Sequence, residues 1–212
     1  MLNANNGRLF EKDGSVGLHL AGERGGQTVY PGQETLDFYT SFAVSAHPNY
    51  SWNANSGDPV AKFVEGRVGL LIGWQGLEND FRRLNKDFDR YKVVALPQPE
   101  VVGPTTPRRD LAVYWTNVVP KSSTNPDLAW RLLQGLLTKG NLSQFADNTG
   151  RIAPSESDGP FVKQLETSAT PFKLEWQATD EIIQDLINQK QSGQSTPTAI
   201  DSAVSRLKEI ER

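Results

Sequence analysis

The apolar residues of the chain follow two spacings. In most segments they recur every three or four positions, which is typical of a helix with one buried face. We expect such helices over residues 34–46, 58–65, 77–88, 126–138, 141–147, 158–167, 172–191 and 197–211. Three other segments, 68–72, 91–96 and 111–119, are short continuous apolar runs. Runs of this length predict strands that are buried on both faces.

The stretch that ends at Trp74 joins several of these signals. Asp58 is a good N-cap and Pro59 suits the first turn of a helix, while Gly66 stands where that helix should stop. The run 68–72 then predicts a strand, and Trp74 follows its carboxyl end. In open α/β sheets, ligands bind at that end of the strands. The pattern therefore places an aromatic side chain where a ligand would meet it.

Strands and helices alternate in the first part of the chain, and helices fill the rest, so the pattern predicts an α/β fold. The 212 residues suffice for one substantial core or two small ones. The net charge is −3, and a nucleic-acid-binding protein would usually show a basic face instead. No run approaches the ~18 apolar residues of a membrane helix.

Residues that carry common enzyme chemistry are scarce. The chain has no Cys, which excludes disulfides, thiolate metal sites and Cys nucleophiles. His19 and His47 are far apart and lack the spacing of metal ligands. There is no P-loop, dinucleotide-binding fingerprint or nucleophile elbow. We therefore expect a protein that is not an enzyme and that has neither a metal nor a cofactor.

Six short motifs stand in order along the chain. They are Asn6-Gly7-Arg8-Leu9-Phe10 with the turn Lys12-Asp13-Gly14, Glu34 to Tyr39, Phe63-x-x-Gly66-Arg67-Val68-Gly69-Leu70, Leu96-Pro97-Gln98-Pro99, Ser123-Thr124-Asn125-Pro126-Asp127-Leu128-Ala129-Trp130, and Gly150-x-x-x-Pro154. Together they resemble the C-terminal portion of family 1 extracellular solute-binding proteins, the sugar receptors of bacterial ABC transporters, to which maltose-binding protein belongs. Leu70 departs from the usual Met, and Gly73-Trp74-Gln75-Gly76 departs from the usual N-G-x-W.

The resemblance implies a type II periplasmic-binding-protein-like fold, in which two α/β lobes enclose the ligand in a cleft. It assigns 1–115 and 152–212 to part of lobe two, and 116–151 to an isolated piece of lobe one with the hinge. The first half of the family's pattern and its signal peptide would be missing, so we expect a fragment. The resemblance also implies a monomeric, periplasmic or extracellular lipoprotein that delivers a carbohydrate to membrane permease subunits and binds no nucleic acid.

Aromatic residues lead the candidate sugar site, because the C–H face of a pyranose stacks on Trp or Tyr. Trp74 lies beside glycines that leave its ring uncovered. Tyr114 and Trp115 are adjacent in a predicted strand, so one of the two should face the cleft. Trp176 begins a helix that, in the family, carries a stacking aromatic from the far side of the cleft. Trp130 lies on a leucine stripe, and we expect it to pack in the core.

Polar residues would complete the site by bonding sugar hydroxyls. Arg151 stands at the inferred hinge, Asn117 lies near the inferred lobe crossover, and Glu78 follows Trp74. Each has a plainer interpretation as a solvated surface residue.

Two other functions are compatible with the sequence. A glycoside hydrolase would use paired carboxylates and would release product from an oligosaccharide. A small protein-interaction domain would bind a partner through the stripe of Leu128, Leu132, Leu133, Leu136 and Leu137. Because a lone lobe would leave this stripe partly uncovered, we expect the chain to aggregate or to bind ligand weakly.

Overall fold

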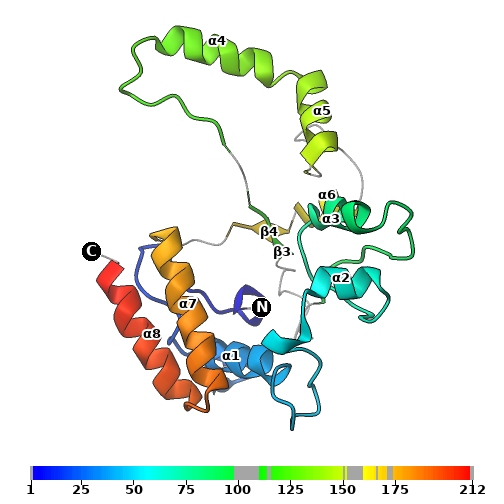
Figure 1. Cartoon of the computed structure of the whole chain (residues 1–212). Coiled ribbons are helices and arrows are strands. Elements are labelled where there is room, and N and C mark those ends of the chain that lie inside the picture. The colour runs from blue at the N-terminus through cyan, green and yellow to red at the C-terminus, as the bar shows by residue number, and fades with distance from the viewer. Residues whose placement is uncertain are drawn as a thin grey trace. The chain divides into compact units, whose positions relative to one another are not determined.

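The computed structural model describes residues 2–97, 110–113, 116–149, 151, 160–165, 167–170 and 174–210 (Figure 1). Contacts within the chain divide it into two compact units. Unit 1 comprises Met1–Ser56, Pro97–Arg109 and Pro171–Arg212, and unit 2 comprises Gly57–Leu96 and Asp110–Thr170.

Unit 1 is built mainly from three α-helices. They are α1 (Pro31–Ser41), α7 (Trp176–Gln191) and α8 (Thr196–Ile210). Two short 3₁₀ helices, η1 (Leu2–Asn5) and η2 (Ala54–Ser56), and an antiparallel hairpin of β1 (Gly22–Arg24) and β2 (Gln27–Val29) complete the unit. The hairpin turns at Gly25 and Gly26, both with positive φ. The predicted turn at Gly14, with φ +90°, is confirmed and leads into a bridge between Phe10 and Val16.

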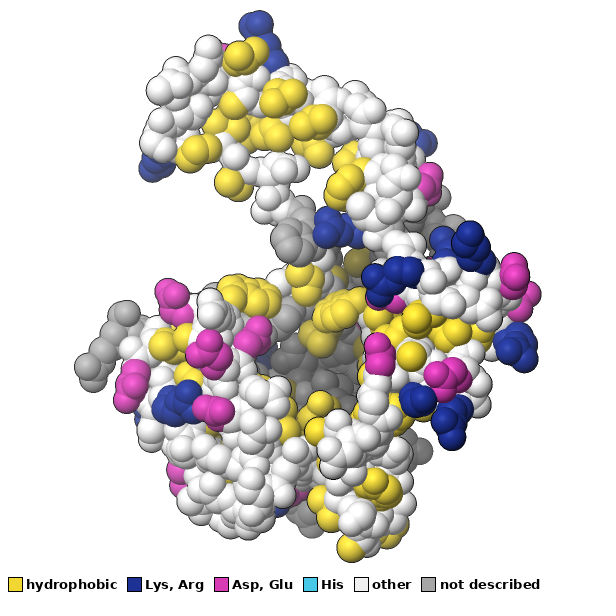
Figure 2. Space-filling model, viewed as in Figure 1, with side chains coloured by type: hydrophobic (Ala, Val, Ile, Leu, Met, Phe, Trp, Pro, Cys, Tyr) yellow, Lys and Arg dark blue, Asp and Glu magenta, His cyan; other side chains and the backbone are white. Residues whose placement is uncertain are grey.

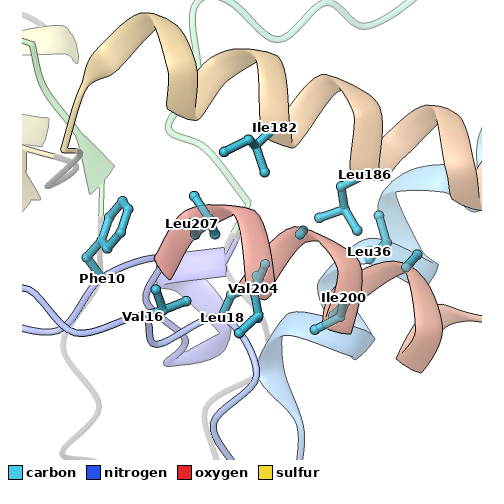
Figure 3. Packing of buried hydrophobic residues seen from close by; sticks show 11 residues of the cluster. Phe10, Val16, Leu18, Leu36, Ile182, Leu186, Ile200, Val204 and Leu207 are labelled. Atoms are coloured by element: carbon cyan, nitrogen blue, oxygen red, sulfur yellow. The ribbon is translucent and has the colours of Figure 1, made fainter. Parts of the chain in front are cut away.

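The core of unit 1 forms where α7 packs against α8 and both meet α1 (Figure 3). Ile182 and Leu186 lie one turn apart on α7, so both point into the core. Helix α8 contributes the most deeply buried side chains, Ile200 and Leu207. The helical periodicity of 172–191 and 197–211 thus predicted this part of the fold correctly.

Unit 2 contains α2 (Pro59–Val64), α3 (Leu77–Leu84), β3 (Asp110–Leu111), α4 (Pro126–Leu136), α5 (Lys139–Thr149), α6 (Pro160–Leu165) and β4 (Ser168–Ala169). Two side-chain caps begin helices of this unit, and the one at Asp58 confirms the prediction made from the sequence. Asp58 Oδ1 accepts a 2.7 Å hydrogen bond from the Val60 amide, and Asn125 Oδ1 accepts one of 3.3 Å from the Leu128 amide. Gly66, with φ +76°, follows α2 as predicted.

An aromatic cluster joins α2 to α3. Phe81 of α3 has its ring centroid 5.4 Å from that of Phe63 in α2, 5.7 Å from that of Phe88 and 5.2 Å from that of Tyr91. Phe88 and Tyr91 stack with an interplanar angle of 10°. Phe81 and Phe88 are buried, so this cluster holds the start of α3 in place.

The three predicted buried strands are wrong for the part of the chain that the structure describes. Residues 68–72 and 91–96 are irregular, and Leu70, Ile72 and Val94 are 65%, 55% and 64% exposed. Among the described residues of 111–119, only Leu111 lies in a strand, β3, which pairs in parallel with β4. A strand needs a neighbour to accept its hydrogen bonds, and the described residues supply none beside 68–72 or 91–96.

Helix α4 exposes its leucine stripe, which we expected from the sequence to be left partly uncovered in this chain (Figure 2). Leu128, Leu132 and Leu136 are 62%, 63% and 53% exposed. Trp130 is also half exposed, so its predicted core position is wrong, because α4 has no buried residue. Helices dominate the described residues, with two small two-stranded sheets.

Candidate functional site

Trp74 lies at the entrance to α3, and its ring is exposed. The carbonyl of Trp74 accepts a 3.0 Å hydrogen bond from the Leu77 amide, which fixes the turn into the helix. A Cβ on Gly73 would lie 2.0 Å from Leu77 Cδ1, so the Leu77 side chain would have to move to admit a side chain at this position. The tryptophan is 59% exposed, which agrees with the expectation that its glycine-rich neighbours leave it uncovered.

Glu78 lies four residues after Trp74, in the first turn of α3. Its Oε1 accepts a 2.8 Å hydrogen bond from the hydroxyl of Tyr91. Glu78 is half-buried, so it is not the freely solvated side chain of the plainer interpretation. The phenol restrains the carboxylate, which belongs to the same turn into α3 as Trp74.

The environment of Tyr91 favours its neutral, hydrogen-bond-donating form. Burial raises the pKa of Tyr91 above its ordinary value of 10.0, and the hydrogen bond to Glu78 and its negative charge raise it further. Nearby Arg82 acts in the opposite direction without reversing the shift of this pKa. At neutral pH the Tyr91 phenol therefore keeps its proton and donates a hydrogen bond to Glu78.

The remaining candidates lie in different parts of the chain. Trp176 is the first residue of α7, in unit 1, and is 49% exposed. Asn117 lies in an exposed irregular segment of unit 2. Arg151 follows α5, and its guanidinium lies 5.4 Å from the centroid of the Phe145 ring. Tyr114 and Trp115 lie outside the described residues.

Trp74 and Glu78 are thus the two candidates that share one local structure. The sequence did not single out two polar neighbours of this pair. Tyr91 was predicted as a strand residue, and only its packing shows that it holds Glu78. Gln75 has a buried Oε1 without a hydrogen-bond partner, directly after Trp74. The sequence offered one signal for a role of Gln75, its position between Trp74 and Gly76, and this position does not predict that its side-chain oxygen is buried.

A buried carboxylate at β3 was also not anticipated. Asp110 is 1% exposed, and its Oδ2 accepts a 2.8 Å hydrogen bond from the hydroxyl of Thr167. The Asp110 amide donates to the Thr167 carbonyl at 3.2 Å. These bonds join β3 to the residue that precedes β4. The segment that contains α4 and α5 therefore begins after one strand of this pair and ends before the other.

The described residues contain no group of three or more His, Asp or Glu side chains placed to hold a metal ion. Nor do these segments include a helix with the length and hydropathy needed to span a bilayer.

The model of one protein family, the bacterial extracellular solute-binding proteins, matches residues 1–142. This is two thirds of the 212 residues. The chain belongs to this family. Membership indicates a periplasmic-binding-protein-like fold, a solute-binding role with ABC transporter components and a location outside the cytoplasm. Members of this family are generally binding proteins rather than enzymes. No curated protein matches the chain.

Proposed function

We propose that this solute-binding protein binds a carbohydrate and that Trp74 is its stacking platform. An exposed indole offers an apolar face to the C–H face of a pyranose, and a carboxylate beside it can accept hydrogen bonds from sugar hydroxyls. Trp74 and Glu78 supply these two groups at the start of α3. The single observation that carries the proposal is the exposed ring of Trp74, four residues before a carboxylate that Tyr91 holds.

The other candidates would contact the ligand from further elements. We assign Trp176 and one of Tyr114 and Trp115 to further sugar stacking, and Arg151 and Asn117 to polar contacts near the hinge. Exposure supports this assignment for Trp176, Asn117 and Arg151. Ligand would bind between the lobes, stabilise the closed form and be delivered to a membrane permease.

We also propose that the chain is the C-terminal portion of a type II receptor. Lobe two would comprise 1–115 and 152–212, and 116–151 would belong to lobe one and the hinge. The parallel pair β3–β4 and the uncovered stripe of α4 support an excursion of the chain into another lobe. The compact units have different boundaries, at Gly57, Pro97, Asp110 and Pro171, and describe contacts within this chain.

The genomic sequence upstream of Met1 tests this part of the proposal. An in-frame extension that begins with a signal peptide or a lipoprotein signal would support a periplasmic, membrane-anchored parent. A stop codon followed by a ribosome-binding site directly upstream of Met1 would contradict it. The expected monomeric state of the parent is tested by light scattering of the extended protein.

Saturation-transfer NMR tests the binding proposal with maltose and methyl glucoside as probes. Trp74→Ala should abolish transfer to the sugar C–H protons, because it removes the stacking surface. Trp130→Ala is a matched control, since Trp130 is 52% exposed and Trp74 is 59% exposed. Equal transfer from both variants would overturn the role of Trp74. Hydrolysis of an oligosaccharide by the wild-type chain would favour the glycoside hydrolase instead.

A further inference from the structure

One asparagine of the chain, Asn6, directly precedes a glycine. The peptide nitrogen that follows an asparagine can attack its side-chain carbonyl carbon, and the attack closes a five-membered ring. A side chain on the following residue obstructs this attack, whereas glycine has none. Asn6 is exposed, and its side chain makes no hydrogen bond within the described part of the chain. Its amide group is therefore free to turn towards the Gly7 nitrogen.

The local fold requires this pair of residues. Asn6 has a φ of +67°, a left-handed conformation that asparagine adopts more readily than most residues with a side chain. At Gly7, a Cβ would lie 2.8 Å from the Cβ of Pro31, a ring atom at the start of α1 that cannot turn away. The reactive dipeptide is therefore held in the sequence by the backbone, since neither residue is easily replaced.

The packing of η1 restrains the attacking nitrogen. The Gly7 amide donates a 3.0 Å hydrogen bond to the Leu2 carbonyl, which closes the turn after η1. Leu2 packs against the core of unit 1, and Asn5 Nδ2 donates a 2.9 Å hydrogen bond to Thr35 Oγ1 on α1. To react, the Gly7 amide must leave the Leu2 carbonyl and lose its proton. The rate of attack thus depends on how often η1 opens.

We propose that Asn6 is a site of spontaneous covalent modification, where deamidation proceeds at a rate set by the opening of η1. Hydroxide removes the proton of the Gly7 amide, and the nitrogen forms a bond to Asn6 Cγ. The bond from Cγ to Nδ2 breaks, and ammonia leaves with a proton taken from water. Water then opens the succinimide ring at either carbonyl carbon, which gives aspartate or isoaspartate. The product carries one new negative charge, and the inference does not rest on carbohydrate binding.

The isoaspartate product changes the backbone beside α1. When water attacks the main-chain carbonyl carbon of residue 6, its bond to the Gly7 nitrogen breaks, and the main chain then runs through Cβ and Cγ. This adds a methylene to the turn that the hydrogen bond from Gly7 to Leu2 closes. Gly7 is buried against Leu2 and Pro31, so the lengthened turn no longer fits. The modification should therefore loosen η1 from α1.

Other residues of the chain provide comparisons within one sample. Asn55 is also exposed, and the amide that follows it donates a 3.0 Å hydrogen bond to the Asn53 carbonyl. It differs from Asn6 because serine, rather than glycine, follows it. Asp13 precedes a glycine, but its ionised carboxylate accepts hydrogen bonds from Ser15 and is a poor target for attack. We therefore expect modification at Asn6 before these sites.

Peptide mapping by mass spectrometry tests the proposal on the full chain, incubated at mildly alkaline pH. Deamidation replaces NH by O and adds about 1 Da to the peptide. Thr35→Val removes the acceptor of the Asn5 hydrogen bond and should release η1. Thr28→Val is the matched control, because Thr28 is exposed on β2 and its side chain makes no hydrogen bond within the described residues. Circular dichroism checks that each variant keeps the helices.

In the wild type, the Asn6 peptide should gain mass at least about tenfold faster than the Asn55 peptide, and urea, which opens η1, should accelerate this gain by at least about tenfold. Thr35→Val should accelerate it about fivefold in native buffer, while Thr28→Val stays within about twofold of wild type. Native protein without any gain at Asn6, or with the same rate as in urea, would overturn the proposal. So would equal rates at Asn6 and Asn55, or an unchanged rate in Thr35→Val.

Discussion

The phenol of Tyr91 donates a 2.8 Å hydrogen bond to Glu78 Oε1 and so connects the aromatic cluster to the candidate site. Tyr91 also stacks on Phe88, and Glu78 lies in the first turn of α3 after Trp74. The side chains that hold the fold of this region thus also restrain the polar group proposed to meet the ligand.

Tyr91→Phe keeps the ring packing and removes this bond. We expect it to lower the free energy of unfolding by about 1 kcal/mol at neutral pH. The raised pKa of Tyr91 means that this stabilisation is fully present below pH 10.0 and is lost as pH rises through the higher folded-state pKa. Denaturation at neutral and alkaline pH measures both effects. Tyr30→Phe, at an exposed tyrosine, should change neither the free energy of unfolding nor its dependence on pH. A loss of unfolding free energy in Tyr30→Phe equal to that in Tyr91→Phe would contradict the role given to the Tyr91 hydrogen bond.

Phe81 is the centre of the aromatic cluster and is 6% exposed. Phe81→Ala removes three ring contacts and leaves a cavity, so we expect a loss of about 3 kcal/mol in unfolding free energy. Leu84→Ala, on the same helix at a side chain that is half exposed, should cost much less. Urea denaturation of the two variants measures the contrast. Similar losses would show that the cluster does not hold α3.

Gly32 lies where α1 passes close to another backbone segment. A Cβ at this position would lie 2.1 Å from the carbonyl oxygen of Leu18, a backbone atom that cannot turn away. Gly32→Ala should therefore destabilise the protein by about 2–3 kcal/mol. At Gly22, also in unit 1, a Cβ would meet its neighbours at 3.8 Å or more, and Gly22→Ala should stay within about 0.5 kcal/mol. Thermal unfolding compares the two, and equal melting temperatures would contradict the packing.

Asp37 of α1 meets both α7 and α8. Lys190 Nζ lies 2.9 Å from Asp37 Oδ1, and the Thr196 hydroxyl donates to the same oxygen. Burial raises the pKa of Asp37, but the hydrogen bonds from Lys190 and Thr196 and the charge of Lys190 outweigh it, so the pKa falls below its ordinary 3.8. The stabilisation is present above pH 3.8 and is lost as pH falls through the lower folded-state pKa.

Asp37→Asn removes this titration. Because the Asp37 side chain is 54% exposed, we expect a loss below about 1 kcal/mol at neutral pH. The difference in unfolding free energy between wild type and variant should shrink as the pH falls below 3.8. Denaturation midpoints measured from neutral to acidic pH give this difference. A constant difference across that range would exclude the carboxylate of Asp37 as its source.

Local signals in the sequence predicted the helices well. Asp58 caps α2 as expected, since a cap needs only a short side chain and two or three following amides, and Asn125 caps α4 in the same way. The apolar spacing predicted α7 and α8 correctly, because their apolar faces pack against each other and against α1.

The strands could not be predicted in the same way, because a strand depends on a distant partner. The run 68–72 has the composition of a buried strand but no neighbour among the described residues. By contrast, Ser168 pairs with Asp110 across 58 residues, and nothing local marked it as a strand. The amphipathic pattern of α4 predicted both the helix and a leucine stripe that this chain leaves partly uncovered, and Leu132 is 63% exposed.

The candidate site likewise combines a feature that the sequence predicted with one that it did not. The glycines around Trp74 correctly predicted an exposed ring. The bond between Tyr91 and Glu78 spans 13 residues and arises from the packing of the aromatic cluster, so no spacing in the sequence revealed it.

Fluorine NMR of 5-fluorotryptophan-labelled protein tests the central claim, that Trp74 is the surface on which this solute-binding protein stacks a carbohydrate. Replacing each of the five Trp in turn assigns the five resonances. Titration with maltose should shift the Trp74 resonance saturably and leave that of Trp130 unchanged, and Trp74→Phe should remove the responding signal. An unchanged Trp74 resonance under saturating maltose and a panel of other sugars would contradict the claim.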